Sequence, residues 1–282
     1  MMLKLTRRRF GQIALTSAAA AGLGYLANKT VAQTPNLLIY GARPIPQAGK
    51  IVVQTLNVTA NVIQDVTSVP IESGEKLTGF TFLANRTIVL SISTVLGGKK
   101  KKENATRLVF VGTTPKTLTV SGLKKEDTLE SLLGLKDGSL IGLVIKKNGR
   151  PPVNVVSIDT NNGRINVIDK IKLPQTERFS NLAQCPNGKI YTTAVGRLGD
   201  TRLVQLDLGQ GKVIPLSQLK FDNKVWNNGL NSLICSPGSQ LLAFGAPRYE
   251  SPNKVYIVNP TNGVMTLLVK GFNVAEIAIP QS

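Results

Sequence analysis

Basic side chains recur in clusters along the chain, about fifty residues apart. Fourteen lysines and arginines fall in five short segments that hold only three acidic residues, Glu103, Asp200 and Glu250. The basic residues are Arg43 and Lys50; Lys99, Lys100, Lys101, Lys102 and Arg107; Lys146, Lys147 and Arg150; Arg197 and Arg202; and Arg248 and Lys254. Arginine binds phosphate, sulfate and carboxylate groups through forked hydrogen bonds, so this pattern predicts an anion-binding surface.

Ten of these residues are the candidates for anion binding: Arg43, Lys99, Lys100, Lys101, Lys102, Lys147, Arg150, Arg197, Arg202 and Arg248. The formal charge of the whole chain is +18 at pH 7, which predicts attraction to an anionic partner and has no bearing on the fold. The alternative is that these lysines and arginines only keep solvated loops soluble.

Carboxylates recur with the same period. Glu75, Asp127 and Glu177 are spaced by 52 and 50 residues, and Asn227 follows 50 residues after Glu177. Carboxylates that converge at one funnel-shaped opening could bind a divalent cation or act as acid and base. The funnel candidates are Glu75, Asp127, Glu130, Glu177 and Glu276. We favour a simpler role as turn caps, paired with cations close to them in the sequence: Lys76, Lys124 and Arg178.

The chain has no histidine and two cysteines. This composition excludes His-dependent triads, imidazole acid–base catalysis and His-ligated metal sites. We therefore predict no cofactor, no metal site and no catalytic residue.

A sequence repeat of about fifty residues sets the positions of these basic and acidic side chains. Leu83, Leu135, Cys185 and Cys235 occupy one register, with spacings of 52, 50 and 50 residues. Each repeat holds four strand-like runs separated by Gly, Pro, Asn and Asp turns. A period in this range, built from short strands, predicts the blades of a β-propeller.

The two ends of the chain supply the closure. The first repeat has three strand-like runs, beginning at Leu37, Lys50 and Asn61, and it lacks an inner strand. The missing strand appears at Asn273–Pro280, where pairing with the first repeat would close the ring and remove exposed edges. We therefore predict an all-β, five-bladed β-propeller closed by a C-terminal strand that completes the first blade.

Strand direction decides which loops share a face. Strands a to d of a blade, counted from the axis outward, alternate in direction, so the b–c loops and the d–a loops emerge together. The basic clusters fall in b–c loops, which predicts one basic face. Glu75, Asp127 and Glu177 should lie on the same face, where the chain enters strand a, and Glu130 and Glu276 lie on the inner strands. The axis of a propeller is crowded, so packing accounts for the small or polar residues expected there: Gly79, Ser131, Asn181, Asn231 and Ala275.

The turns PNGK and SPGS and the phrase VSIDTNNGRI resemble those of WD-repeat and YVTN-type propellers. The resemblance covers nearly the whole chain after the leader, but the Gly-His and Trp-Asp signatures of true WD repeats are missing. It therefore implies the fold and not a partner.

The segment TRRRFGQ, from Thr6 to Gln12, resembles the twin-arginine export motif. A run rich in Ala and Gly follows from Ile13 to Ala27, and small residues allow cleavage after Ala32. We predict a twin-arginine signal peptide over 1–32 and a single propeller domain over 33–282. The expected location is the periplasm, another extracytoplasmic compartment or the thylakoid lumen. The alternative is an N-terminal amphipathic or membrane-anchoring helix.

Cys185 and Cys235 replace apolar residues of other repeats, so we predict buried, free thiols. Export to an oxidising compartment would permit a disulfide, but we expect neighbouring inner strands to lie too far apart for one. Trp226 precedes Asn227 at the basic face, where it would fill a gap between blades or stack on a sugar ring.

Together these features predict a binding function. We expect an exported, monomeric, non-enzymatic binding or scaffold propeller whose basic face recognises an anionic polysaccharide, an anionic membrane surface or an acidic protein. Nucleic acid would bind such a surface by charge, but an exported location makes it a poor physiological partner. The alternative is a glycosidase-like hydrolase that uses the funnel carboxylates.

Overall fold

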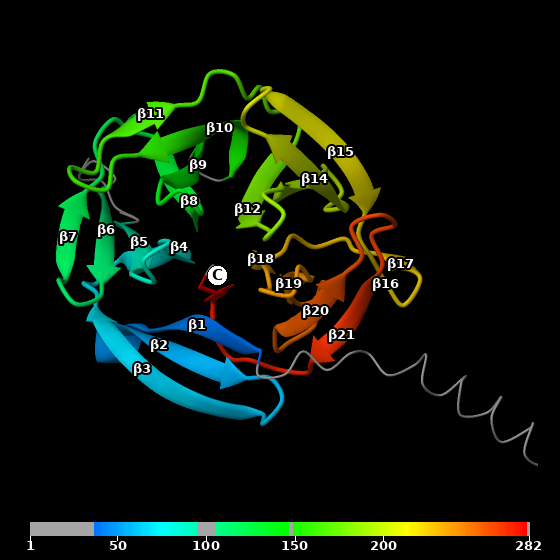
Figure 1. Ribbon diagram of the computed structural model, residues 1–282, viewed down its shortest axis with the longest axis horizontal. Coiled ribbons are helices and arrows are strands. Elements are labelled where there is room, and N and C mark those ends of the chain that lie inside the picture. The colour runs from blue at the N-terminus through cyan, green and yellow to red at the C-terminus, as the bar shows by residue number, and fades with distance from the viewer. Residues whose placement is uncertain (1–36, 95–104, 147–148, 281–282) are drawn as a thin grey trace, which may run out of the picture. The chain divides into compact units, whose positions relative to one another are not determined.

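The computed structural model describes residues 37–94, 105–146 and 149–280. The strands form five four-stranded antiparallel sheets around a central axis, which confirms the five-bladed β-propeller (Figure 1). Among the described residues, no helix is long and apolar enough to cross a membrane. The leader over residues 1–32, with the predicted export signal, lies outside the described residues.

Each blade contains four strands, of which the first named lies nearest the axis and the last lies outermost. Blade 1 contains β22 (Glu276–Ala278), β1 (Leu38–Ile45), β2 (Lys50–Asn57) and β3 (Val62–Pro70). Blade 2 contains β4 (Glu75–Phe82), β5 (Ile88–Thr94), β6 (Thr106–Val111) and β7 (Lys116–Thr119). Blade 3 contains β8 (Asp127–Gly134), β9 (Leu140–Lys146), β10 (Arg150–Ile158) and β11 (Ile165–Val167). Blade 4 contains β12 (Arg178–Gln184), β13 (Ile190–Val195), β14 (Thr201–Asp207) and β15 (Lys212–Gln218). Blade 5 contains β18 (Ser232–Cys235), β19 (Leu241–Gly245), β20 (Lys254–Val258) and β21 (Met265–Val269).

Two short elements lie in loops. The 3-10 helix η1 (Pro46–Ala48) joins β1 to β2, and a hairpin of β16 (Lys220–Phe221) and β17 (Lys224–Val225) lies between blades 4 and 5.

The C-terminal strand closes the ring as predicted. β22 pairs antiparallel with β1, with Ala278 opposite Tyr40 and Glu276 opposite Ala42. The innermost strand of blade 1 therefore comes from the end of the chain (Figure 1). This pairing covers an edge of β1 that would otherwise expose unpaired backbone groups.

Apolar side chains fill each of the five junctions between neighbouring blades. The strands second from the axis are buried along almost their whole length, because a blade is covered on both faces. Their sequences are accordingly runs of Ile, Leu, Val and Ala. Burying one such side chain stabilises a fold by about 1.5–3 kcal/mol, so packing between blades is the main source of stability.

Polar groups beside the axis also connect the blades. Gly134 N donates to Thr81 Oγ1 at 3.1 Å between blades 3 and 2, and Asn181 N donates to Ser131 Oγ at 2.8 Å between blades 4 and 3. Three more hydrogen bonds join neighbouring segments beside the axis in the same way, and we call all five bonds the axial belt. The others are Asn181 Nδ2 to Leu230 O (3.0 Å), Asn231 Nδ2 to Ala275 O (3.3 Å) and Ile277 N to Ser232 Oγ (2.9 Å).

The two cysteines form a disulfide, so the prediction of free thiols is wrong. The Cα atoms of Cys185 and Cys235 lie 5.0 Å apart, within the range that a disulfide requires. The expectation failed because the inner strands of blades 4 and 5 come close together at this point, beside the axis. Cys185 is buried and Cys235 is half-buried.

Candidate anion-binding site

An open cleft of about 530 Å³ lies where blades 4 and 5 meet on the basic face. Three arginines line it, Arg178, Arg197 and Arg248, and we call it the arginine cleft. Its other polar side chains are Ser180, Asn227, Asn228 and Asn231. None of the described residues that line it is acidic. Its volume falls within the range of about 300–1,000 Å³ that is usual for ligand sites.

The arginine cleft is built from the loops that the repeat predicted to emerge together. Arg197 belongs to the b–c loop of blade 4 and Arg248 to that of blade 5, while Arg178 begins strand a of blade 4. The asparagines all come from the d–a connection between these blades, and Asn231 is its last residue before β18.

Hydrogen bonds fix these loops against one another. Thr201 Oγ1 donates to Asn228 O at 2.9 Å, and Asn228 Nδ2 donates to Ala246 O at 2.9 Å. Gly199 has a φ of +89°, and a Cβ atom there would approach Asn227 O to 2.5 Å. Only glycine allows this close approach, which brings the loop of Arg197 against the d–a connection.

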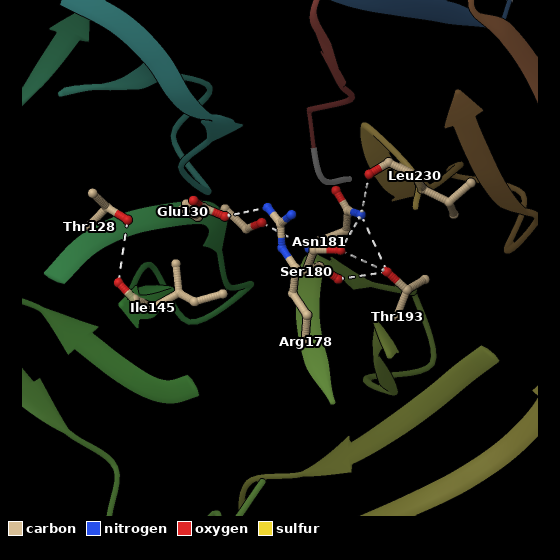
Figure 2. Close-up of polar contacts among 9 residues, drawn as sticks. Thr128, Glu130, Ile145, Arg178, Ser180, Asn181, Thr193 and Leu230 are labelled. Atoms are coloured by element: carbon tan, nitrogen blue, oxygen red, sulfur yellow. Dashed lines mark hydrogen bonds and ion pairs between the residues drawn. The ribbon is translucent and has the colours of Figure 1, made fainter. Parts of the chain in front are cut away.

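The arginines of the cleft differ in their partners. Arg178 forms an ion pair with Glu130 of β8 at 3.0 Å, which Figure 2 shows beside the bonds of Ser180 and Asn181. Arg197 and Arg248 are exposed, and neither pairs with a carboxylate among the described residues. Two guanidinium groups are therefore free to form charge-assisted hydrogen bonds with a ligand.

The funnel carboxylates mostly have arginine partners. Glu75 binds Arg107 at 2.8 Å, and this guanidinium lowers the pKa of Glu75. Glu177 forms an ion pair with Arg202 in the same way, from the start of strand a to the start of strand c of one blade. Glu75 also accepts a hydrogen bond from the backbone N–H of Glu72, as expected of a turn cap.

These partners are not the ones that sequence proximity suggested. We expected Glu75 and Glu177 to pair with Lys76 and Arg178, and they pair with arginines 25 to 32 residues further along the chain. Asp127 lies opposite Lys146 in the ladder between β8 and β9. Within a blade, strands a and c present their ends to the same face, and this geometry selects the partner.

Glu276 lies beside a narrow channel along the axis, of about 40 Å³. Burial and, to a lesser degree, repulsion from Glu130 raise the pKa of Glu276 to about 8, although a hydrogen bond from the backbone of Phe80 acts in the opposite direction. A channel of this volume accommodates roughly three water molecules, and a sugar ring does not fit.

Among the candidates whose side chains the structure describes, Arg43 and Arg202 do not line the arginine cleft. Arg43 is half-buried in β1, Arg202 is held by Glu177, and Arg150 begins β10. Lys147 and the run from Lys99 to Lys102 lie outside the described residues. Of the predicted residues that the structure describes, Arg197 and Arg248 come together in the cleft.

Several cleft residues were missed as binding candidates. Arg178 was assigned a capping role, and Ser180 was not singled out. The asparagines could have been found, because Asn227 and Asn228 follow Trp226 in a d–a loop that the repeat places on the basic face. Trp226 itself is 3% exposed and packs edge-on against Tyr256 at 5.4 Å between ring centroids, so it fills a gap in the core.

No family model matches this chain, and no curated protein matches it. Solved structures share its fold at low identity. An α-L-arabinanase from Penicillium chrysogenum, complexed with arabinobiose, is 12% identical with a TM-score of 0.50, and the match covers 86% of this chain and 81% of that one. TolB from Acinetobacter baumannii is 16% identical with a TM-score of 0.48, over 82% of this chain. A Bacteroides caccae protein of unknown function is 13% identical with a TM-score of 0.48, over 87% of this chain and 98% of that one.

This chain spans 52% of the length of TolB. The likeness to the arabinanase shows the propeller fold alone, and it does not assign the chain to the WD-repeat or YVTN families.

Proposed function

We propose that this protein is an exported, non-enzymatic propeller that binds an anionic partner in the arginine cleft. The observation that carries the proposal is the pair of exposed guanidinium groups, Arg197 and Arg248, in an open cleft with no acidic residue on its described walls. Binding of a carboxylate, sulfate or phosphate would give these groups the partner that Arg107 and Arg202 already have.

The remaining polar side chains suit a ligand that carries more than charge. Asn227, Asn228 and Asn231 line the cleft, and an amide both donates and accepts hydrogen bonds. Hydroxyl groups have the same dual character, so an acidic polysaccharide matches this wall better than a bare phosphate surface does. The glycosidase-like alternative relies on the funnel carboxylates, and none of these five residues lines the cleft.

Paired substitutions of equal charge test the proposal. Binding of sodium glucuronate and of a hyaluronan tetrasaccharide to the full chain would be measured by calorimetry at 50 and 300 mM NaCl. Arg197→Ala with Arg248→Ala should weaken binding at least about tenfold per arginine, because a hydrogen bond to a charged group contributes about 1.5–3 kcal/mol. Binding by the unchanged chain should also weaken at the higher salt.

The matched control removes two charges from the opposite face. Lys189 and Lys212 are exposed, the first in the a–b loop of blade 4 and the second at the end of its c–d loop. Lys189→Ala with Lys212→Ala should leave both affinities within about twofold, since distant surface charges are screened. Equal losses in the two double variants would show attraction by net charge alone and would contradict a specific cleft.

A further inference from the structure

A second pocket of about 280 Å³ adjoins the arginine cleft. Phe221, Trp226 and Tyr249 contribute to its walls, and we call it the aromatic pocket. It shares Asn227 and Arg248 with the cleft, so the two pockets are neighbours on this face. Arg248 can therefore contact a ligand in either pocket.

Tyr249 presents its ring to solvent at this pocket. It is 94% exposed, which makes it the most exposed large hydrophobic side chain among the described residues. Its φ is +70°, a conformation that bulky residues rarely adopt and that tends to occur at functional sites. The guanidinium carbon of Arg248 lies 5.1 Å from the ring centroid, which links the aromatic surface to the charge of the cleft.

The two compartments differ in the net charge of their walls, which is balanced in the aromatic pocket and positive in the cleft. Asp222 and Glu250 line the aromatic pocket, together with Lys224 and Arg248, whereas no described acidic residue lines the cleft. Lys254 pairs with Glu250 at 2.9 Å, and no ion pair involves Asp222 among the described residues. Carboxylates accept hydrogen bonds from hydroxyl groups, and a wall of balanced charge does not attract a second anion as the cleft does, so this compartment favours an uncharged, hydroxyl-bearing unit.

Unpartnered polar groups lie at the same pocket. Trp226 Nε1 and Tyr256 Oη are buried and have no hydrogen-bond partner among the described residues. The Tyr256 ring packs edge-on against Phe221, at 5.0 Å between centroids, and against Trp226. Burial, with smaller effects of Glu250 and Asp222, raises the pKa of Tyr256 to about 12, so its hydroxyl remains a neutral donor. Both groups lie in or directly behind the pocket wall.

We infer that the aromatic pocket is a second subsite, which binds an uncharged sugar ring against Tyr249 while the arginine cleft holds the adjoining acidic unit. The ligand is then an acidic oligosaccharide in which charged and uncharged units alternate. This inference rests on the proposed function of the arginine cleft. It names the class of ligand, which anion binding alone does not.

Three variants and four probes test the two-subsite arrangement in the full chain. The probes are glucuronate, a hyaluronan tetrasaccharide with alternating acidic and uncharged units, tetragalacturonate with a carboxylate on every unit, and polyglutamate. Tyr249→Ala should weaken tetrasaccharide binding about tenfold and leave glucuronate binding within twofold, because only the longer ligand reaches the ring. Tyr249→Phe keeps the ring and should stay within about threefold of the unchanged chain.

The third variant tests the effect of a negative charge on the wall of the aromatic pocket. Asp222 has a φ of 49°, which asparagine tolerates well, so Asp222→Asn removes the charge without disturbing the turn. It should improve tetragalacturonate binding several-fold relative to the hyaluronan tetrasaccharide, because a repulsive carboxylate has gone.

The outcomes separate the inference from the proposed function. Unchanged tetrasaccharide binding in Tyr249→Ala, or tighter binding of tetragalacturonate or polyglutamate than of the tetrasaccharide by the unchanged chain, overturns the second subsite while the arginine cleft stands. If Arg197→Ala with Arg248→Ala leaves all four affinities unchanged, both proposals fail.

Discussion

The axial channel and the arginine cleft are both polar, yet their polar groups are used differently. Beside the channel, Ser131 and Asn181 are joined from blade to blade by the hydrogen bonds of the axial belt. In the cleft, Arg197 and Arg248 have no carboxylate partner among the described residues. Polar residues at the axis thus contribute to stability, whereas Arg197 and Arg248 at the mouth remain available to a ligand.

The arginines of the basic face divide along the same line. Arg107 and Arg202 begin strand c and are held by Glu75 and Glu177, so much of their charge is already neutralised. Arg197 and Arg248 lie in b–c loops, before β14 and β20, and both are exposed. The first two arginines, within strand c, thus pair with a carboxylate of their blade, whereas the other two, in the b–c loops, face solvent.

Removing the disulfide beside the channel should have the largest effect on stability. Cys185→Ala with Cys235→Ala opens a crosslink between residues 50 positions apart, which typically costs about 2–4 kcal/mol. We expect the Tm in calorimetry to fall by about 5–15 °C. Glucuronate binding at a temperature where the variant is folded should stay within twofold, because neither cysteine lines the cleft. Weakened binding in the folded variant would contradict the separation of the two regions.

Glu276 should make the stability of the channel depend on pH. Its folded pKa of about 8 lies above the usual value of 4.5, so the folded protein holds a proton that the unfolded chain has released between these pH values. The stabilising contribution is therefore complete below pH 4.5 and is lost as the pH rises through 8.

The substitution Glu276→Gln should remove this dependence. An amide oxygen can still accept the hydrogen bond from Phe80, and no charge has to be buried. One titrating group changes the free energy of unfolding by at most about 1.4 kcal/mol per pH unit. Because Glu276 borders the channel, we expect a smaller change. In urea unfolding from pH 5 to 8, we expect the variant to gain about 2 kcal/mol relative to the unchanged chain. Exposed Glu126→Gln is the matched control. If the free energy of unfolding of Glu276→Gln changed with pH in parallel with that of the unchanged chain, the raised pKa of Glu276 would be disproved.

Sequence predicted the features that each repeat encodes locally. Turn residues at matching offsets marked the strands, and the incomplete first repeat identified Asn273–Pro280 as its inner strand, of which the structure pairs Glu276–Ala278 with β1. The register also placed Arg197, Arg248 and Asn227 at one face. These inferences needed only the period of the pattern and the alternation of strand direction.

The features that sequence could not predict depend on distances between repeats. The disulfide requires inner strands to converge to 5.0 Å between Cα atoms, which no spacing along the chain reveals. The partners of Glu75 and Glu177 were likewise misjudged, because strands a and c bring together residues that are distant in sequence. The aromatic pocket depends on the β16–β17 hairpin between blades 4 and 5, an element that the repeat does not contain.

The smallest expected effect comes from breaking one ion pair in two ways. Glu177→Gln leaves Arg202 with its charge uncompensated next to Arg178, whereas Arg202→Gln leaves the charge of Glu177 there instead. Both variants lose the same partly buried pair and should lose about 1 kcal/mol in urea unfolding. Their effects on glucuronate affinity should have opposite signs, with Glu177→Gln about two- to threefold tighter and Arg202→Gln weaker by a similar factor, because the local charge changes in opposite directions. If both variants changed the affinity in the same direction, distortion of the blade and not charge would control binding, and the distinction between paired and open arginines would have no consequence for the ligand.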